Sequence, residues 1–287
     1  MTVDTAIGTR MHPSAWQVFR RNRMSVVGLW LLVAFVVVAL LGSLYTPFDP
    51  NKVGAGARMV APNLDHPMGT DELGRDIFSR VLEGMRTSLL VGLSAAAIST
   101  FLGIVVGSLS GFIGRWIDDA LMRLTEVFQI IPRFFLAMML VSFFGPSIFN
   151  IVLAIALLSW PELARVVRSE FLSLRSRQYV DAARVAGASD THLVFVQILP
   201  NALGPAIVNA TLLIGQAILL EAGLSYLGLG DRNQISLGVM LFDAQYIMRS
   251  AWWATAFPGM MIFVIVLAMN LLGDGLNDVL NPRSRNR

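Results

Sequence analysis

Residues 178–205 read QYVDAARVAGASDTHLVFVQILPNALGP, and this stretch determines how the rest of the chain is organised. Its start is polar, its end is apolar, and it lies between two long hydrophobic segments. Gly187 is placed to end a short helix, because glycine adopts the left-handed conformation beyond a helix C-terminus without steric cost. Ser189 or Asp190 can cap a second helix that runs towards Pro200. The pattern predicts two short helices joined by a Gly-Ala-Ser turn, which together form a compact knob.

The composition indicates a protein that lies in a lipid bilayer. Of 287 residues, 55% are hydrophobic and only 14% are charged, with a mean hydropathy of +0.64, whereas a soluble domain carries roughly 25% charged residues. Cysteine is absent, which excludes disulfides and thiolate metal sites. The net charge of +3 does not indicate nucleic-acid binding, because the basic residues flank apolar segments instead of forming one stripe.

Uncharged stretches predict an all-α integral membrane protein with six transmembrane helices. The first is residues 24–48, preceded by a cytoplasmic tail (1–23) that does not have the pattern of a cleavable signal peptide. Residues 49–86 are rich in glycine, proline and mixed charge, and we expect them outside the cytoplasm. Residues 87–280 then form a five-helix core, and residues 281–287 form a cytoplasmic tail. The five core helices are expected at 87–114, 120–143, 147–166, about 203–229 and 251–273. Between the last two, residues 231–249 are expected to form a polar excursion.

Four of the polar residues within or near these predicted spans are candidates for a functional role. Gly145-Pro146-Ser147 separates the third span from the fourth, which leaves Glu126 and Arg133 on the third. They are seven residues apart, so one helix would place them on one face, where they could pair; Pro132 would loosen that helix locally. Polar groups in a membrane usually face protein or water. Candidates for lining a pathway, or for polar contacts between helices or subunits, are Glu126, Arg133, Gln216 and Glu221.

The distribution of basic residues predicts the orientation. With six helices, one side of the membrane carries fourteen Lys and Arg residues and the other side carries seven. Loops rich in Lys and Arg stay in the cytoplasm. We therefore expect both termini and the knob to face the cytoplasm.

Three motifs, in order along residues 14–282, resemble those of ABC importer permeases. Asp181-Ala182-Ala183, Gly187 and Leu199-Pro200 are similar to the EAA loop of that family, although Asp181 replaces the usual Glu and Gln197 the usual Ile or Val. Residues 69–80, GTDELGRDIFSR, resemble the GTDxxGRDxxSR signature of its peptide/nickel branch. Residues 221–230, EAGLSYLGLG, resemble the EAxLSFLGLG run of the same branch.

This resemblance implies a type I ABC importer permease (MetI-like) architecture in a bacterial inner or plasma membrane. Its coupling loop would be residues 170–200, docked into an ATP-hydrolysing subunit that drives alternating access. The implied partners are a second homologous permease, two ABC ATPase subunits, an extracytoplasmic substrate-binding protein and a peptide substrate. The solute stays open among dipeptides, longer peptides, nickel chelates and some sugars or opines. The implied docking residues are Asp181, Ala182, Ala183, Gly187, Ala188, Leu199 and Pro200.

The sequence lacks the usual catalytic patterns. Lys52 is the only lysine and follows Asn51, so no Walker A motif exists; no H-E-x-x-H or G-x-S-x-G occurs either. We expect no enzymatic activity and no cofactor in this chain, with ATP and Mg bound by the partner ATPases. The alternative is a secondary transporter or channel that works without ATP, which internal repeats would favour. A scaffold or insertion protein, the third class, would carry no solute flux.

Overall fold

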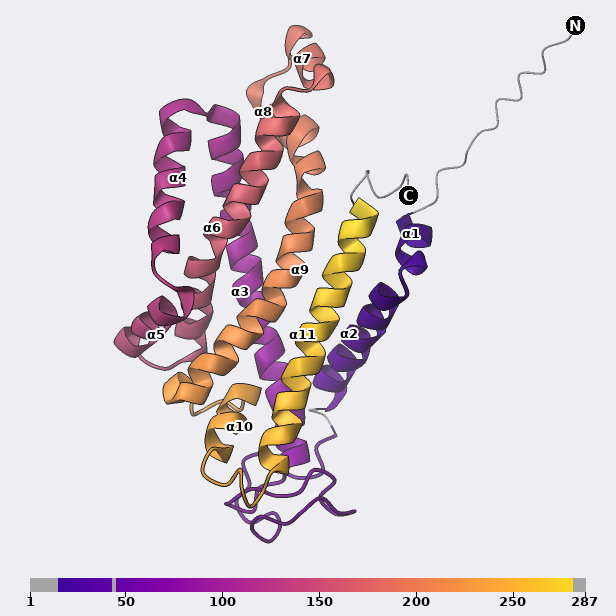
Figure 1. Cartoon of the computed structure of the whole chain (residues 1–287), viewed down its shortest axis with the longest axis vertical. Coiled ribbons are helices and arrows are strands. Elements are labelled where there is room, and N and C mark those ends of the chain that lie inside the picture. Colours follow the sequence, from indigo (N-terminus) through magenta and orange to yellow (C-terminus); the bar gives the residue numbers. More distant parts are fainter. Residues whose placement is uncertain (1–14, 43–44, 281–287) are drawn as a thin grey trace, which may run out of the picture.

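The computed structural model of the chain describes residues 15–42 and 45–280, and these are helical apart from residues 45–76 and the turns between helices (Figure 1). Residues 1–14 of the predicted N-terminal tail and the whole predicted C-terminal tail, 281–287, lie outside the described residues. The elements are, in chain order, α1 (Ala15–Arg21), α2 (Arg23–Gly42), α3 (Ile77–Ile113), α4 (Arg115–Ile130), α5 (Arg133–Phe144), α6 (Ile148–Arg175), α7 (Gln178–Val185), α8 (Asp190–His192), the π-helical turn η1 (Leu193–Ile198), α9 (Leu199–Leu224), the π-helical turn η2 (Ser225–Leu229), α10 (Leu237–Ala244) and α11 (Trp253–Leu280).

The long helices run side by side, and the molecule has two distinct ends (Figure 1). One end carries α7, α8, the turn between α3 and α4, α1 and the last turns of α11. The opposite end carries α10 and residues 45–76. We call these the knob end and the α10 end.

The predicted six-span, all-α fold is confirmed, with the third span broken. Five helices of the described residues are long and apolar enough to cross a membrane, and the pair α4 and α5 makes a sixth if it counts as one span. Several predicted bounds are wrong. Helix α2 ends at Gly42, short of residue 48, while α11 runs on to Leu280. Helix α3 begins at Ile77, inside the predicted segment 49–86, because the Asp76 carboxylate caps its first turn by accepting from the Ser79 amide (2.8 Å).

The third span is two helices, and the prediction of one helix over residues 120–143 is wrong. Helices α4 and α5 meet at an angle of 84°. Ile131 has extended backbone angles (φ −90°, ψ 132°), as expected before Pro132, because the proline ring disfavours helical geometry in the preceding residue. Gly145 then ends α5, and the Ser147 hydroxyl caps α6 by accepting from the Asn150 amide (3.2 Å). Helix α6 continues past its predicted end at residue 166 to Arg175.

Helices α3 and α6 pack closely through a stripe of small residues. Gly103, Gly107 and Gly111 of α3 face α6 at a spacing of four residues. A Cβ atom at Gly107 would lie 2.5 Å from the carbonyl oxygen of Ala164, which is closer than atoms can approach. Small residues let helix backbones meet closely in a bilayer, so these three glycines allow the close α3–α6 contact.

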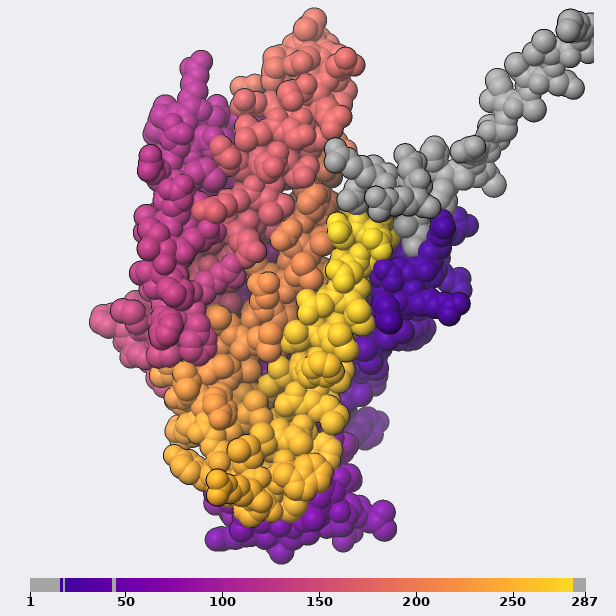
Figure 2. Space-filling model, viewed as in Figure 1, coloured from indigo at the N-terminus to yellow at the C-terminus, as the bar shows by residue number. Residues whose placement is uncertain are grey.

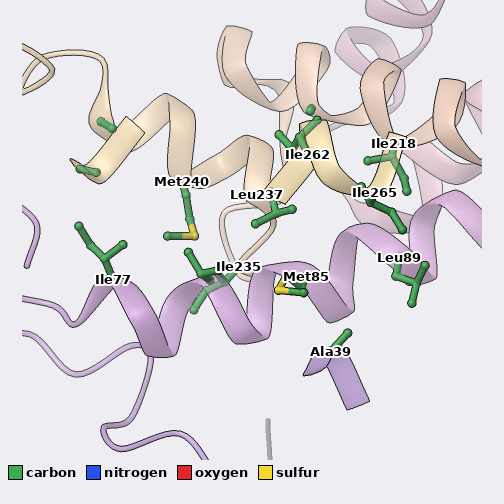
Figure 3. Packing of buried hydrophobic residues seen from close by; sticks show 14 of the residues in the cluster. Ala39, Ile77, Met85, Leu89, Ile218, Ile235, Leu237, Met240, Ile262 and Ile265 are labelled. Atoms are coloured by element: carbon green, nitrogen blue, oxygen red, sulfur yellow. The ribbon is translucent and has the colours of Figure 1, made fainter. Parts of the chain in front are cut away.

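Residues 231–249, predicted as a polar excursion, contain the apolar helix α10. Its Leu237 and Met240 are buried in one hydrophobic cluster with Ile77 and Met85 of α3 (Figure 3). Residues of α9 and α11, including Ile218 and Ile265, complete that cluster. The excursion is therefore packed against the helix bundle and joins three of its long helices at the α10 end.

Candidate functional site

The knob, residues 178–192, projects at one end of the molecule (Figure 2). Gly187 lies just past α7 with a φ of 88°, as predicted. Its amide donates to the Arg184 carbonyl (3.0 Å), and the Ala188 amide donates to the Ala183 carbonyl (3.0 Å). This pair of hydrogen bonds is the Schellman motif, which satisfies the last carbonyls of a helix. The turn is thus rigid, although its tip is open to solvent.

The second helix of the knob is not short, which corrects the prediction. Ser189 caps it as expected, since its hydroxyl accepts from the His192 amide (3.3 Å). The helix then continues through η1 into α9, so that 40 residues, Asp190–Leu229, form one candidate span. Pro200 does not end this run, because it lies just past the π-helical turn η1, in which the Leu199 amide donates to the Val194 carbonyl. The predicted fifth span is therefore present, but its helix begins at Asp190 and not near residue 203.

A buried cluster attaches the knob to the transmembrane helices. Val180 of α7 is fully buried together with Leu193 and Ile198 of η1 and Phe171 of α6. The Tyr179 hydroxyl also donates to the Gln197 carbonyl (3.4 Å). Apolar contacts therefore join α7 to both α6 and η1, and one hydrogen bond also joins it to η1.

The predicted docking residues lie together on or near the outer surface of the knob. Asp181 pairs with Arg184 (3.2 Å), and both side chains are about half exposed. Two apolar side chains that the prediction missed are more exposed: Val185 at 90% and Phe195 at 62%. The only sequence signal for Val185 was its position directly before the turn. The predicted docking residues fall into two groups by exposure. The exposed ones are Asp181, Ala182, Gly187 and Pro200, and the partly buried ones are Ala183, Ala188 and Leu199.

Glu221 lies inside the protein and does not line an open path in this structure. Its side chain, on α9, is 2% exposed. One carboxylate oxygen accepts from Ser225 and Ser236 (both 2.7 Å), and the other accepts from Ser88 of α3 (3.3 Å). A buried carboxylate is tolerated when such donors surround it, so Glu221 holds α3, α9 and the start of α10 together.

The other three candidate polar residues do not join Glu221. Arg133 forms an ion pair with Glu162 of α6 instead of the predicted pair with Glu126, because the bend at Pro132 places Glu126 on a different helix. Glu126 is exposed on α4. Gln216 and Glu162 line a small cavity of about 70 Å³ between α6 and α9. Arg133 and Gln216 therefore both lie near Glu162, while Glu126 and Glu221 lie elsewhere.

The residue 69–80 motif folds into a turn that is fixed by its own carboxylates. Asp71 accepts from the amides of Leu73 and Arg75 (both 2.9 Å) and from the Arg75 side chain (2.5 Å). Asp76 caps α3 and also contacts Nδ1 of the buried His66 (2.8 Å). The positions of Asp71 and Asp76 in the motif thus each have a local structural cause.

The same motif is joined to α10 through two arginines. Arg75 and Arg80 both donate to one oxygen of Asp243, at 3.0 and 2.9 Å. This contact is not among the predicted ones, because Asp243 lies within residues 231–249, which were expected to form a polar excursion. Among residues 15–42 and 45–280, no group of three or more His, Asp or Glu side chains is arranged to hold a metal ion.

Two family descriptions match the sequence. Residues 103–286 match the family described as binding-protein-dependent transport system inner membrane component. Residues 14–64 match the N-terminal transmembrane domain of oligopeptide transport permease C.

Curated relatives match along nearly the whole chain. The dipeptide transport system permease protein DppC of Alkalihalophilus pseudofirmus is 38% identical over 272 residues, covering 94% of this chain and 90% of that protein. The di/tripeptide transport system permease protein DppC of Pseudomonas aeruginosa is 39% identical over 278 residues, covering 94% of this chain and 92% of that protein.

Solved structures share the fold. An inward-facing structure of the MetNI methionine ABC transporter contains a chain with a TM-score of 0.56 at 22% identity, covering 69% of this chain and 95% of that one. A second crystal form of the same transporter gives a TM-score of 0.54 at 18% identity. At this identity the likeness concerns the arrangement of helices alone, and it agrees with the predicted MetI-like architecture.

Proposed function

This chain belongs to the family of binding-protein-dependent transport system inner membrane components, and we propose that it is the permease subunit through which an ATP-driven importer moves peptides. The family is a multi-pass inner membrane permease family, and the six-span fold fits it. Peptide is the proposed solute because relatives at 38–39% identity carry dipeptide and di/tripeptide permease names.

The observation that carries the proposal is the continuity between the knob and the membrane helices. The exposed face of α7 offers Val185 and Asp181 to a partner. The buried face of α7 holds Val180 against η1, and η1 leads without interruption into α9. A partner that moves the knob therefore moves a transmembrane helix with it, as a conformational coupling element requires.

In this proposal the knob end faces the cytoplasm, where two ABC ATPase subunits bind ATP and Mg and dock against residues 178–200. The basic residues of the knob side support that orientation. The α10 end faces outwards, towards an extracytoplasmic binding protein that delivers the solute. A second, homologous permease completes the pathway, and ATP-driven changes in the ATPase pair alternate its opening between the two sides.

The first test is purification of the tagged chain from its native host in mild detergent, followed by mass spectrometry of the proteins that accompany it. We expect a second six-span permease and proteins with Walker A motifs, and we expect the latter to be lost from the Gly187→Val variant. Uptake of labelled dipeptide into vesicles holding the recovered complex should then depend on ATP. A homo-oligomer that moves solute without any ATPase would refute the proposal in favour of gradient-driven transport.

A further inference from the structure

A polar cavity of about 280 Å³ lies at the α10 end, between the residue 69–80 motif, η2 and α10. We call it the α10 pocket. Its lining contains charged groups of both signs, which distinguishes it from a packing gap between apolar side chains. The charged and hydroxyl side chains of this lining are Glu72, Arg75, Arg80, Ser225, Arg232 and Asp243.

Arg80 is a nearly buried cation whose hydrogen bonds are incomplete. It is 3% exposed, and within the described residues its guanidinium donates only to Asp243 (2.9 Å). A guanidinium carries five N–H donors, and buried donors without acceptors are unfavourable. Because Arg80 lines the α10 pocket, an acceptor placed in the pocket would meet the remaining donors.

Arg232 supplies a second available guanidinium. Its central carbon lies 4.9 Å from the centre of the Phe242 ring, so a cation–π contact holds it at the pocket. In the part of the chain that the structure describes, no carboxylate lies within ion-pair distance of Arg232. Arg75, by contrast, is already engaged by Asp71 (2.5 Å) and Asp243 (3.0 Å). A carboxylate entering the pocket would therefore find Arg80 and Arg232 open to it.

The pocket also presents acceptors. Asp243 uses one carboxylate oxygen for both arginines, and its other oxygen has no hydrogen-bond partner among the described residues. Glu72 is exposed and pairs with no described cation. Together with Asp71 behind Arg75, three carboxylates balance the three arginines. A neutral pocket with open donors and open acceptors complements a zwitterion better than it complements a simple anion.

We propose that the α10 pocket binds a zwitterionic solute, a free amino acid or a short peptide, on its way to the membrane. Its carboxylate contacts Arg80 and Arg232, and its ammonium group contacts Glu72 and Asp243. This inference rests on the proposed function, since a peptide importer would receive such solutes at this end. Pockets for drug-sized ligands begin near 300 Å³, so the α10 pocket suits a solute of dipeptide size.

The test uses the assembled permease–ATPase complex without its binding protein, in detergent, titrated calorimetrically with three probes. These are Ala-Ala, N-acetyl-Ala-Ala, which lacks the ammonium group, and Ala-Ala amide, which lacks the carboxylate. We expect Ala-Ala to bind and each blocked peptide to bind about tenfold more weakly, because each loses one charge-assisted contact. Equal binding of all three probes, or no binding of Ala-Ala, would overturn the proposal.

Substitutions of residues that line the α10 pocket test whether Ala-Ala binds there. Arg232→Gln and Glu72→Gln should each weaken Ala-Ala binding about tenfold. Arg249→Gln is the matched control, because Arg249 is an exposed arginine near α10 that does not line the pocket. Unchanged Ala-Ala affinity in Arg232→Gln would overturn the assignment.

The same variants separate this inference from the proposed function. If ATP-driven uptake with the binding protein persists while Ala-Ala fails to bind the complex alone, only the zwitterion site is refuted. If Arg232→Gln abolishes capture of the binding protein but leaves Ala-Ala binding intact, the carboxylate that the pocket recognises belongs to the binding protein, and the solute site is likewise overturned.

Discussion

The hydroxyl of Ser236, at the start of α10, donates a hydrogen bond of 2.7 Å to the buried carboxylate of Glu221 in α9. Ser236 also caps α10 by accepting from the Val239 amide (3.1 Å). Ser88 of α3 also makes two hydrogen bonds: its hydroxyl donates to Glu221 (3.3 Å) and accepts from the Leu237 amide (3.2 Å). One carboxylate therefore fixes where α10 begins relative to two long helices.

Replacing this carboxylate should loosen α10. Glu221→Ala leaves three buried hydroxyls without their acceptor, and we expect it to lower the free energy of unfolding by about 3 kcal/mol. Hydrogen exchange at residues 237–244 should become faster, and thermal unfolding in detergent should occur at lower temperature. Glu221→Gln is the control, since its amide oxygen still accepts and its size is unchanged, so the loss should be smaller. Unaltered exchange in α10 of Glu221→Ala would contradict the structural role given to this residue.

Substitution of Gly187 should affect coupling through the backbone alone. A Cβ atom there would meet nothing within 4 Å, so the strain of Gly187→Ala comes only from its positive φ and costs about 1–2 kcal/mol. We expect the complex to assemble with weaker ATPase docking and to take up less solute per ATP hydrolysed. Gly259→Ala is the matched control, because its added Cβ also meets nothing within 4 Å and Gly259 does not have a positive φ. The same uptake per ATP in both variants would argue against a rigid turn as the coupling element.

Two ion pairs should differ in strength according to their burial. Arg168 of α6 binds Asp118 of α4 through two hydrogen bonds, of 2.5 and 2.6 Å, and Asp118 is mostly buried. The pair between Asp181 and Arg184 is single and about half exposed. Double-mutant cycles on unfolding, using Asn for Asp and Gln for Arg, should give a coupling of about 2 kcal/mol for the first pair and below about 0.5 kcal/mol for the second. Equal couplings would show that α4 is held to α6 by other contacts.

A side chain at Gly107 should separate α3 from α6. We expect Gly107→Val to lower the free energy of unfolding by about 1–3 kcal/mol or to prevent folding, because the added atoms collide with the backbone of α6. Gly204→Ala serves as the control, since its Cβ would sit at an ordinary 3.7 Å from Leu280. Yield of folded protein and the midpoint of thermal unfolding report the difference. A fully stable Gly107→Val would mean that the two helices have room to move apart.

The features that the sequence predicted correctly are local. Gly187 and Ser189 end and begin helices through hydrogen bonds to residues at most five positions away, so a short stretch contains all the information. The apolar spans are likewise recognisable by composition, because a helix that crosses the bilayer needs a long run of mostly apolar side chains. Their ends were predicted less well, since capping by Asp76 and continuation through Pro200 depend on details within one turn.

The features that the sequence did not predict join distant segments. Arg80 and Asp243 are 163 positions apart, and Arg168 and Asp118 are 50 apart. No periodic pattern relates such residues; their pairing depends on which helices become neighbours. The prediction that Glu126 pairs with Arg133 was wrong. It required both residues to lie on one face of one helix, and the bend at Pro132 places them on two helices.

The helical run from Asp190 to Leu227 has a mechanical consequence. It extends about 57 Å at 1.5 Å per residue, and it ends before Gly228, whose φ of 86° is not helical. Glu221 fixes this rod about 46 Å from its knob end and about 9 Å from its other end. When the rod tilts about that pivot, the two ends move in proportion to these arms, so a shift of about 5 Å at Asp190 becomes about 1 Å at Leu227. Travel is reduced and force is multiplied by the same factor, which favours prising open a tightly packed seal over sweeping a wide channel.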